Sequence, residues 1–279
     1  MLSNKILSNK ILSYWSVPAY LPYVQHDLTD ERIKNAEKTL GVTLPKEYID
    51  LLKVQNGGYI RYKLDGFPHS VTYGIGGFYP NLTDLDWSDY EGYVSFELNG
   101  LIPFDGDGHW YLCFDYRGNE NEPQITYIDT EVDTEQIVAN TFSDYLTKLI
   151  VETDDLWVIE TNEKIGKIIN NIETILQVKF EEPDTWAHGY PIYRCEYNEG
   201  WIWVSPNNVL RGFVRRDDDR YEELIKKTEG NALRYPELHE NDILVSFSEE
   251  DDANHIIDSL KKNAINTNIR PLSEYIANR

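Results

Sequence analysis

Patterns typical of helices and strands run through the chain once and then begin again after residue 155. A helix pattern, a long stretch of strands and loops, and a closing helix pattern fill residues 14–152. A very regular helix pattern then opens a second series. A chain of 279 residues has room for two hydrophobic cores. We therefore predict two domains, residues 14–152 and residues 153–279, after a flexible or weakly helical leader at residues 1–13.

Local signals in the first domain predict helices beside strands. Thr29 can cap a helix that Gly41 ends, and Pro45 is suited to the first position of a second helix. Two runs rich in β-branched and aromatic residues, 110–115 and 124–129, are expected to form neighbouring strands. A closing helix is expected where apolar residues repeat at helical spacing, at Val138, Phe142, Leu146 and Leu149.

The second domain also mixes the two kinds of element. The most regular amphipathic pattern of the chain predicts a helix over residues 165–176. A hairpin signal, Asn198-Glu199-Gly200, joins the strands expected at residues 190–197 and 201–205. A buried strand at residues 243–247 precedes a further helix. This order predicts a small α+β domain.

The chain carries far more acidic than basic residues. Lys and Arg number 26 and Asp and Glu 48, which gives a net charge of −22. Such a surface repels nucleic-acid phosphates and anionic lipid headgroups, and it attracts a basic protein. We therefore expect a basic protein partner and no direct binding of nucleic acid or membrane. The alternative is that the acidity only keeps the protein soluble.

Cysteine content and the first residues bear on the compartment. Cys113 and Cys195 are too few for a disulfide framework or a four-cysteine zinc site. In the opening stretch MLSNKILSNKILSYW, Lys, Asn and Ser interrupt every apolar run, so we expect neither a signal peptide nor a membrane span. These observations favour a reducing compartment, and we expect a cytoplasmic protein.

Residues 105–109, Asp-Gly-Asp-Gly-His, raise the question of a metal site or a catalytic carboxylate pair. An EF-hand calcium loop is excluded, because counting from Asp105 puts Trp110 where glycine is needed and Tyr116 where a glutamate is needed. The chain also lacks a Gly-x-Ser-x-Gly elbow and a phosphate-binding glycine loop. Asp-Gly pairs are above all turn formers. We expect a turn, no enzyme and no cofactor or metal; a site using the two aspartates and the histidine is the alternative.

Two loops mix carboxylates with large aromatic rings, a combination suited to a protein interface. Aromatic side chains give contact area at low entropy cost, and carboxylates pair with Lys and Arg of a partner. The predicted partner-binding residues are Asp84, Asp86, Trp87, Asp89, Tyr90, Glu91, Asp105, Asp107, His109 and Trp110. The alternative is that Trp87 and Trp110 pack inward and the acids are only solvated.

An ordered series of motifs in the first half of the chain resembles one protein family. The motifs are Tyr20-Leu21-Pro22-Tyr23, Leu40-Gly41-Val42-Thr43-Leu44-Pro45, Asn56-Gly57-Gly58 and Ile102-Pro103-Phe104-Asp105-Gly106-Asp107-Gly108-His109. Over residues 14–150 the chain is similar to bacterial members of the SUKH superfamily, the group related to the yeast Smi/Knr regulators of cell-wall glucan synthesis. The resemblance implies helices packed on a mostly antiparallel curved sheet, an α+β fold, and no catalytic residues.

The resemblance also implies a function. Bacterial SUKH proteins are similar to immunity proteins, which neutralise toxins that in many cases act on nucleic acids. Our first hypothesis is an intracellular immunity protein whose acidic face in residues 73–110 blocks a cognate toxin. The second is a non-enzymatic regulatory or scaffolding protein of the yeast type. Residues 155–279 are assigned to no family, and a second immunity module, a dimerisation domain and an unrelated binding domain remain open for them; the oligomeric state is not predicted.

Overall fold

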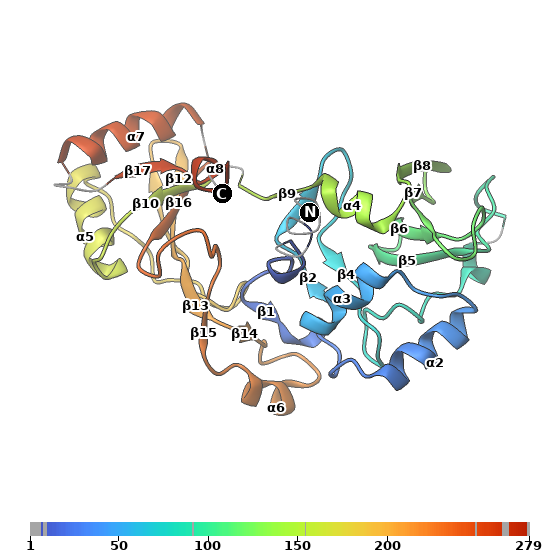
Figure 1. The fold of residues 1–279 in the computed structure, drawn as a ribbon. Coiled ribbons are helices and arrows are strands. Elements are labelled where there is room, and N and C mark those ends of the chain that lie inside the picture. Colours follow the sequence, from blue (N-terminus) through green and yellow to red (C-terminus); the bar gives the residue numbers. More distant parts are fainter. Residues whose placement is uncertain are drawn as a thin grey trace. The chain divides into compact units, whose positions relative to one another are not determined.

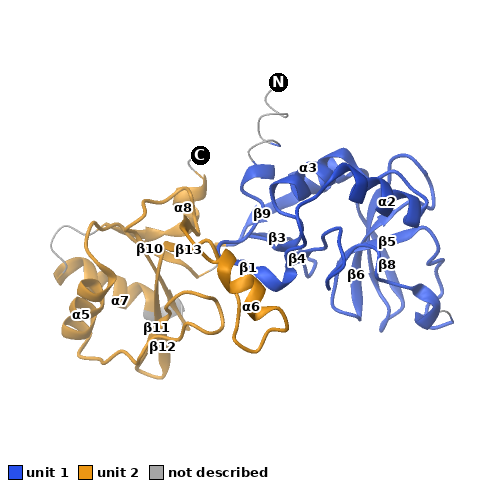
Figure 2. Cartoon of the chain, turned by 90° about the horizontal axis from the view of Figure 1, so that it is seen from below, with its two compact units in different colours: residues 1–152 blue, residues 153–279 orange. Residues whose placement is uncertain are grey.

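The computed structural model describes residues 7, 10–90, 92–153, 155–248, 250–263 and 268–277. The chain divides into two compact units, Met1–Glu152 (unit 1) and Thr153–Arg279 (unit 2), shown in Figure 2. Each unit has its own hydrophobic core. Both units combine helices with antiparallel sheets, so the predicted α+β class is confirmed.

The predicted leader is only partly described. Residues 1–6, 8 and 9 lie outside the described residues. Lys10 donates hydrogen bonds of 2.7 Å to the carbonyl oxygens of Leu146 and Leu149, and Ile11 packs against the core of unit 1. The end of this segment is therefore anchored rather than flexible, because a lysine that reaches the last carbonyl groups of a helix satisfies them.

Two helices of unit 1 form where the sequence predicts them. α2, Asp30–Leu40, begins after Thr29, whose side chain accepts a 3.2 Å hydrogen bond from a backbone N–H of the first turn. It ends at Gly41, whose φ of 72° lies in the left-handed region that glycine adopts readily. α3, Lys46–Val54, follows Pro45.

A four-stranded antiparallel sheet, in the order β5-β6-β7-β8, forms the centre of unit 1 (Figure 1). Its strands are β5 Leu101–Gly106, β6 Trp110–Asp115, β7 Gln124–Asp129 and β8 Thr134–Ala139. β6 and β7 are the two predicted strands, and they pair as neighbours. The helix predicted from Val138 onward is wrong at both ends. Its apolar repeat runs through three elements, because Val138 belongs to β8, α4 covers only Phe142–Lys148, and Leu149 opens β9.

α3 and α4 pack on one face of this sheet. The ring centroid of Tyr48, from α3, lies 5.0 Å from that of Phe114 in β6 and 5.8 Å from that of Phe142 in α4. β2 pairs with β4, and β3 pairs with β9. The short elements of unit 1 are β1 Ala19–Tyr20, η1 Leu21–Tyr23, β2 Gly58–Tyr59, β3 Tyr62–Leu64, β4 Val71–Thr72, η2 Trp87–Tyr90 and β9 Leu149–Val151.

The opposite face of the sheet carries a smaller apolar cluster. Its buried members come from β5, β6, β7 and the residue Leu98. Side chains of the loop that precedes β5 pack against them: Leu85, Trp87, Tyr90, Val94 and Phe96. This loop therefore has a structural task, which limits what its aromatic rings can offer to a partner.

Unit 2 is built on a five-stranded antiparallel sheet in the order β11-β12-β16-β10-β17. The strands are β10 Trp157–Ile159, β11 Tyr193–Tyr197, β12 Gly200–Pro206, β16 Ile243–Phe247 and β17 Ile269–Pro271. α5 Ile165–Leu176 and α7 Glu250–Asn263 pack on one face, and α8 Leu272–Ala277 adds to an apolar cluster with residues of β10 and β16. The predicted helix at residues 165–176 and the strand at residues 243–247 are confirmed, whereas β10 and β17 were not predicted.

The remaining elements of unit 2 are short. They are β13 Asn208–Leu210, β14 Gly212–Phe213, α6 Tyr221–Leu224, η3 Ile225–Lys227 and β15 Asn231–Leu233. The predicted hairpin joins β11 to β12, with Tyr197 paired to Gly200 and with Asn198 at a φ of 54°. Within the described ranges, no helix has both the length and the apolar character needed to cross a membrane.

Candidate partner-binding surface

The aromatic rings of the loop before β5 turn toward the sheet. Trp87 donates a 2.9 Å hydrogen bond from Nε1 to the carbonyl oxygen of Leu101. The Tyr90 hydroxyl donates to the carbonyl oxygen of Gly108 at 3.1 Å and lies 2.6 Å from the hydroxyl of Tyr111. Both rings are half-buried. These two rings therefore pack inward, and a partner can contact only the part of each ring that stays exposed.

Trp110 also packs inward, on the other face of the sheet. Its ring is half-buried and stacks on that of Tyr127, with 6.2 Å between the centroids and 23° between the planes. Both rings pack against the main core of unit 1. Trp110 is thus chiefly part of the packing at the start of β6.

The acids of the loop before β5 are exposed, unlike its rings. Asp84 accepts a 2.7 Å hydrogen bond from a nearby asparagine side chain, and Asp86 accepts one of 2.9 Å from the backbone N–H of Ser88. Asp89 is also exposed. Glu91, a further predicted residue, lies outside the described residues. The described carboxylates of this loop point to solvent, where a partner can reach them.

Asp105 is buried, which contradicts its prediction as a partner-binding residue. The residue is 1% exposed. A β-bulge between Pro103 and Asp105 shifts the register, so that Asp105 stands opposite Leu112, whose side chain belongs to the helix-covered core. Both Phe104 and Asp105 therefore point inward, against the alternation of a regular strand.

The carboxylate of Asp105 ends a buried chain of hydrogen bonds. Its Oδ2 lies 2.6 Å from Nδ1 of His69 and accepts a 3.1 Å bond from the backbone N–H of Ser70. The other ring nitrogen of His69 is hydrogen-bonded to the hydroxyl of Tyr145, which lies 3.1 Å from that of Tyr14. All four side chains of this chain of hydrogen bonds are buried. A substrate cannot reach them, so the aspartate–histidine pair serves the core.

Asp107 and His109 are exposed in the turn between β5 and β6. Oδ1 of Asp107 accepts hydrogen bonds from the backbone N–H groups of His109, at 2.9 Å, and Trp110, at 3.2 Å. Desolvation raises the pKa of Asp107, but these two bonds outweigh it and the pKa is lowered. His109 Nδ1 lies 2.9 Å from Oε1 of Glu131. The geometry is that of a turn, and the described residues contain no metal-holding group of three or more His, Cys, Asp or Glu.

The turn between β7 and β8 also belongs to this surface, although its residues were not among those predicted. The backbone N–H of Thr130 donates to the carbonyl oxygen of His109 at 2.8 Å. Oδ1 of Asp133 accepts a 2.6 Å hydrogen bond from the backbone N–H of Ser95. The available signal was the alternating run Asp-Thr-Glu-Val-Asp-Thr-Glu, which places a carboxylate at every second residue.

Three segments distant in the sequence thus contribute to one acidic surface. We define the acidic loop surface as the exposed carboxylates of Asp84, Asp86, Asp89, Asp107, Glu131 and Asp133. Between residues 64 and 147 the chain has 16 Asp and Glu and a single Lys or Arg, Arg117. Nη2 of Arg117 lies 2.7 Å from a carboxylate oxygen of Asp115 and 2.7 Å from one of Glu135. The hydrogen bond to Asp115 is the main cause that raises the pKa of Arg117. Arg117 is therefore already paired.

A hollow of about 680 Å³ lies beside Asp86, a member of the acidic loop surface. Apolar side chains of the loop before β5 line it, among them Leu85, Val94 and Phe96. The carboxylate-bearing residues Asp86 and Glu97 also line it. The hollow therefore offers both apolar and polar groups to a side chain of a partner.

The fold and this surface define unit 1 as an α+β domain that displays carboxylates on its loops and keeps its aspartate–histidine pair in the core. Residues 27–148, which lie within unit 1, match the model of the SMI1 / KNR4 family (SUKH-1), as the motifs predict. The match covers fewer than half of the 279 residues. The family is consistent with an immunity-like or a Smi1-type protein, and it suggests a role in protein–protein interaction. No curated protein matches the chain.

Proposed function

We propose that unit 1 is an immunity domain that binds and neutralises a basic protein toxin through the acidic loop surface. The observation that carries the proposal is the charge imbalance of residues 64–147, where the only Arg or Lys, Arg117, is already paired with two carboxylates. A surface of this kind attracts a basic partner over several ångströms and repels other acidic molecules.

The proposed partner acts on nucleic acid, for example as a nuclease. Such a toxin needs a basic groove to hold the phosphate backbone of its substrate. Exposed carboxylates on these loops can occupy that groove in place of phosphates, and the hollow beside Asp86 can hold one anchoring side chain. Neutralisation would then follow from blocking the substrate, and the proposed role is non-enzymatic and needs no cofactor.

The alternative is a regulatory or scaffolding role of the Smi/Knr type. The family match supports both roles equally, because it covers unit 1 alone and names no partner. The two proposals differ in one outcome. An immunity protein protects a cell against one toxin, whereas a scaffold changes the activity of a cellular pathway without any toxin present.

The test begins with co-expression of the protein and a candidate toxin encoded beside it, with growth as the readout. The expected result is restored growth and a complex that forms more slowly as salt rises. The charge variant combines Asp86→Asn, Asp89→Asn, Glu131→Gln and Asp133→Asn, all at exposed positions. Its association rate with the toxin should fall about tenfold or more and depend less on salt.

A matched control removes the same number of charges from unit 2, at Asp217, Asp219, Glu199 and Glu240, which are exposed. This variant should keep the association rate within about twofold of the original protein. Equal losses in the two variants would show that net charge matters and the acidic loop surface does not. No rescue and no binding by the original protein would remove the immunity proposal.

A further inference from the structure

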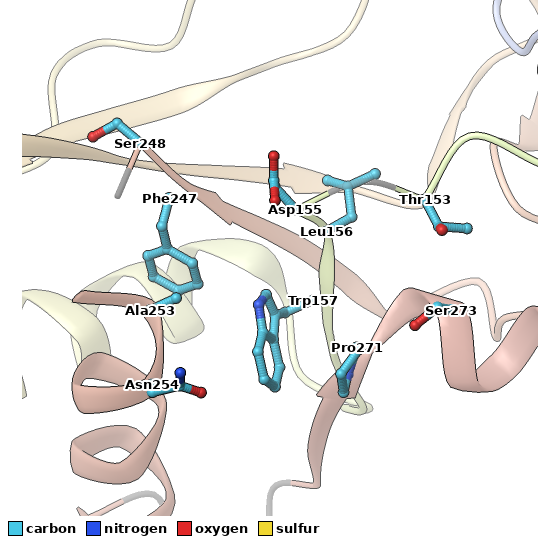
Figure 3. A pocket seen from close by; sticks show the side chains of 10 residues that line it. All are labelled: Thr153, Asp155, Leu156, Trp157, Phe247, Ser248, Ala253, Asn254, Pro271 and Ser273. Carbon is cyan, nitrogen blue, oxygen red and sulfur yellow. The ribbon is translucent and has the colours of Figure 1, made fainter. Parts of the chain in front are cut away.

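A pocket of about 640 Å³ opens in unit 2, between the beginning of β10 and the beginning of α7 (Figure 3). Trp157, the first residue of β10, lies between its paired neighbours Val245 of β16 and Pro271 of β17. Ala253 and Asn254, from the first turns of α7, line the same pocket. The pocket belongs to unit 2 alone, outside the residues that match the family.

Two aromatic rings line this pocket. Trp157 is half-buried, and Phe247 is 8% exposed. Both side chains lie on the same face of the sheet, because Phe247 follows the partner of Trp157 in β16 by two residues. Figure 3 shows both rings among the lining side chains. Aromatic faces attract cations as well as apolar groups.

The charge of the lining is negative. Asp155 is the charged residue among the described side chains that line the pocket, and it is exposed. The same described lining contains no Lys, Arg or His. A phosphate or carboxylate ligand would therefore meet a like charge and no counter-ion, which disfavours nucleotides and organic acids here.

Three polar side chains of the pocket are unpaired among the described residues. In the part of the chain that the structure describes, the side chains of Asp155, Trp157 and Asn254 make no hydrogen bond to another residue. A carboxylate, an indole N–H and a carboxamide are thus available to a ligand. A few polar groups in a pocket that is also lined by aromatic rings are typical of a small-molecule site.

We propose that this pocket binds an organic cation, a guanidinium or alkylammonium group, with the Trp157 ring against its face and Asp155 as its counter-ion. A guanidinium suits the pocket best, because its weakly hydrated face packs on an aromatic ring and its charge is attracted by the Asp155 carboxylate. The group can come from an arginine side chain of a peptide or from a free amine such as a polyamine.

The experiment measures binding to the full-length chain by calorimetry. The probes are arginine amide, its uncharged isostere citrulline amide, spermidine, and a capped glycine–serine peptide with a single arginine. Arginine amide should bind about tenfold more tightly than citrulline amide, because only the former carries the charge. The variants Asp155→Asn and Trp157→Leu should each weaken that binding about tenfold.

The control variants change the same residue types elsewhere in unit 2. Asp217→Asn and Trp186→Phe lie outside the pocket, at an exposed aspartate and at a tryptophan that is 57% exposed, and they should bind as the original chain does. If Trp157→Leu fails to fold, Asp155→Asn decides, because its side chain is exposed and makes no hydrogen bond to another described residue.

Each outcome has one meaning. Tighter binding of the peptide than of the free amines identifies the ligand as an arginine of another protein, and equal binding identifies a small cation. Equal affinity for arginine amide and citrulline amide overturns the proposal, as does binding that survives Asp155→Asn. Failure of every probe to bind overturns it as well. None of these outcomes depends on the immunity role proposed for unit 1.

Discussion

The carboxylate of Asp105 accepts four hydrogen bonds inside the core of unit 1. The donors are Nδ1 of His69 and the backbone N–H groups of Ser70, Val71 and Gly106. Burying a carboxylate costs several kcal/mol unless its lone pairs are filled in this way. Asp105 therefore stabilises the fold and does not serve a surface.

Asp105→Ala should lower the free energy of unfolding by about 3 kcal/mol or more, because it leaves His69 and the backbone donors unsatisfied in the core. Urea unfolding followed by circular dichroism measures the change. Asp107→Ala is the control, since Asp107 is exposed and closes only a turn. Its cost should be about 1 kcal/mol. Equal losses at the two positions would mean that the buried network contributes little.

Asp115 is a second single residue whose contribution to the stability of the fold depends on pH. Burial raises its pKa, but hydrogen bonds from Arg117 and Thr126 outweigh burial, so its pKa lies below the ordinary value. An aspartate in an unfolded chain has a pKa of about 3.9. The ionised carboxylate therefore stabilises the fold fully above about pH 4, and this contribution is lost as the pH falls through the lowered pKa.

Asp115→Asn should thus destabilise the protein by about 1–2 kcal/mol at neutral pH, and by less near pH 3. The measurement compares urea unfolding of the two proteins at both pH values. Glu120→Gln, at an exposed loop position, should show little difference at either pH. A loss for Asp115→Asn that does not change with pH would contradict the ion-pair account.

At the scale of the element, both ends of α2 are set by single residues that the local sequence predicts, Thr29 and Gly41. Gly41 ends α2 in the left-handed conformation, and a Cβ placed there would meet no atom within 4 Å. Gly166, inside α5, also has open space around it, but its φ is not in the left-handed region. Sterics are therefore equal at the two positions, and only backbone conformation differs.

Replacement of each glycine by alanine should move stability in opposite directions. Gly41→Ala should cost about 1 kcal/mol, because alanine resists a positive φ. Gly166→Ala should add about 0.5 kcal/mol, because alanine is the better helix former. Urea unfolding of the full chain measures both. Changes in the free energy of unfolding that have the same sign for both variants would show that packing, and not backbone conformation, governs these positions.

The strands show which parts of the fold the local sequence does not predict. β6 and β7 were predicted because their apolar and β-branched residues alone indicate strands. β8 was missed because residues 134–137 are exposed and mostly polar, so they form a strand only through their pairing with β7. The bulge in β5 likewise has no local signal, although it decides that Asp105 points into the core.

At the scale of the whole molecule, the chain carries two separate cores. The main cluster of unit 1 draws on residues up to Val151, and the main cluster of unit 2 begins at Trp157. Each unit also has a complete central sheet of its own. A core of this size in each part is what independent folding requires.

Fragments 1–152 and 153–279 should therefore each fold when expressed alone. Each should show a cooperative urea transition, and their far-ultraviolet circular dichroism spectra should add to that of the full chain. The fragment 1–152 should also bind the proposed toxin as tightly as the full chain does. A fragment that stays unfolded, while the full chain folds, would show that the two cores depend on each other.

The sequence alone determined the α+β class, both ends of α2, the position of α5 and the resemblance of residues 27–148 to the SMI1 / KNR4 family, because capping residues, apolar periodicity and motif order are local properties. It also determined the excess of carboxylates. Tertiary structure decided how they are used: the bulge in β5 buried Asp105, and the pairing of β7 with β8 brought Glu131 and Asp133 beside the loops before β5 and β6. Contacts between residues distant in the chain depend on strand register, which no single segment specifies.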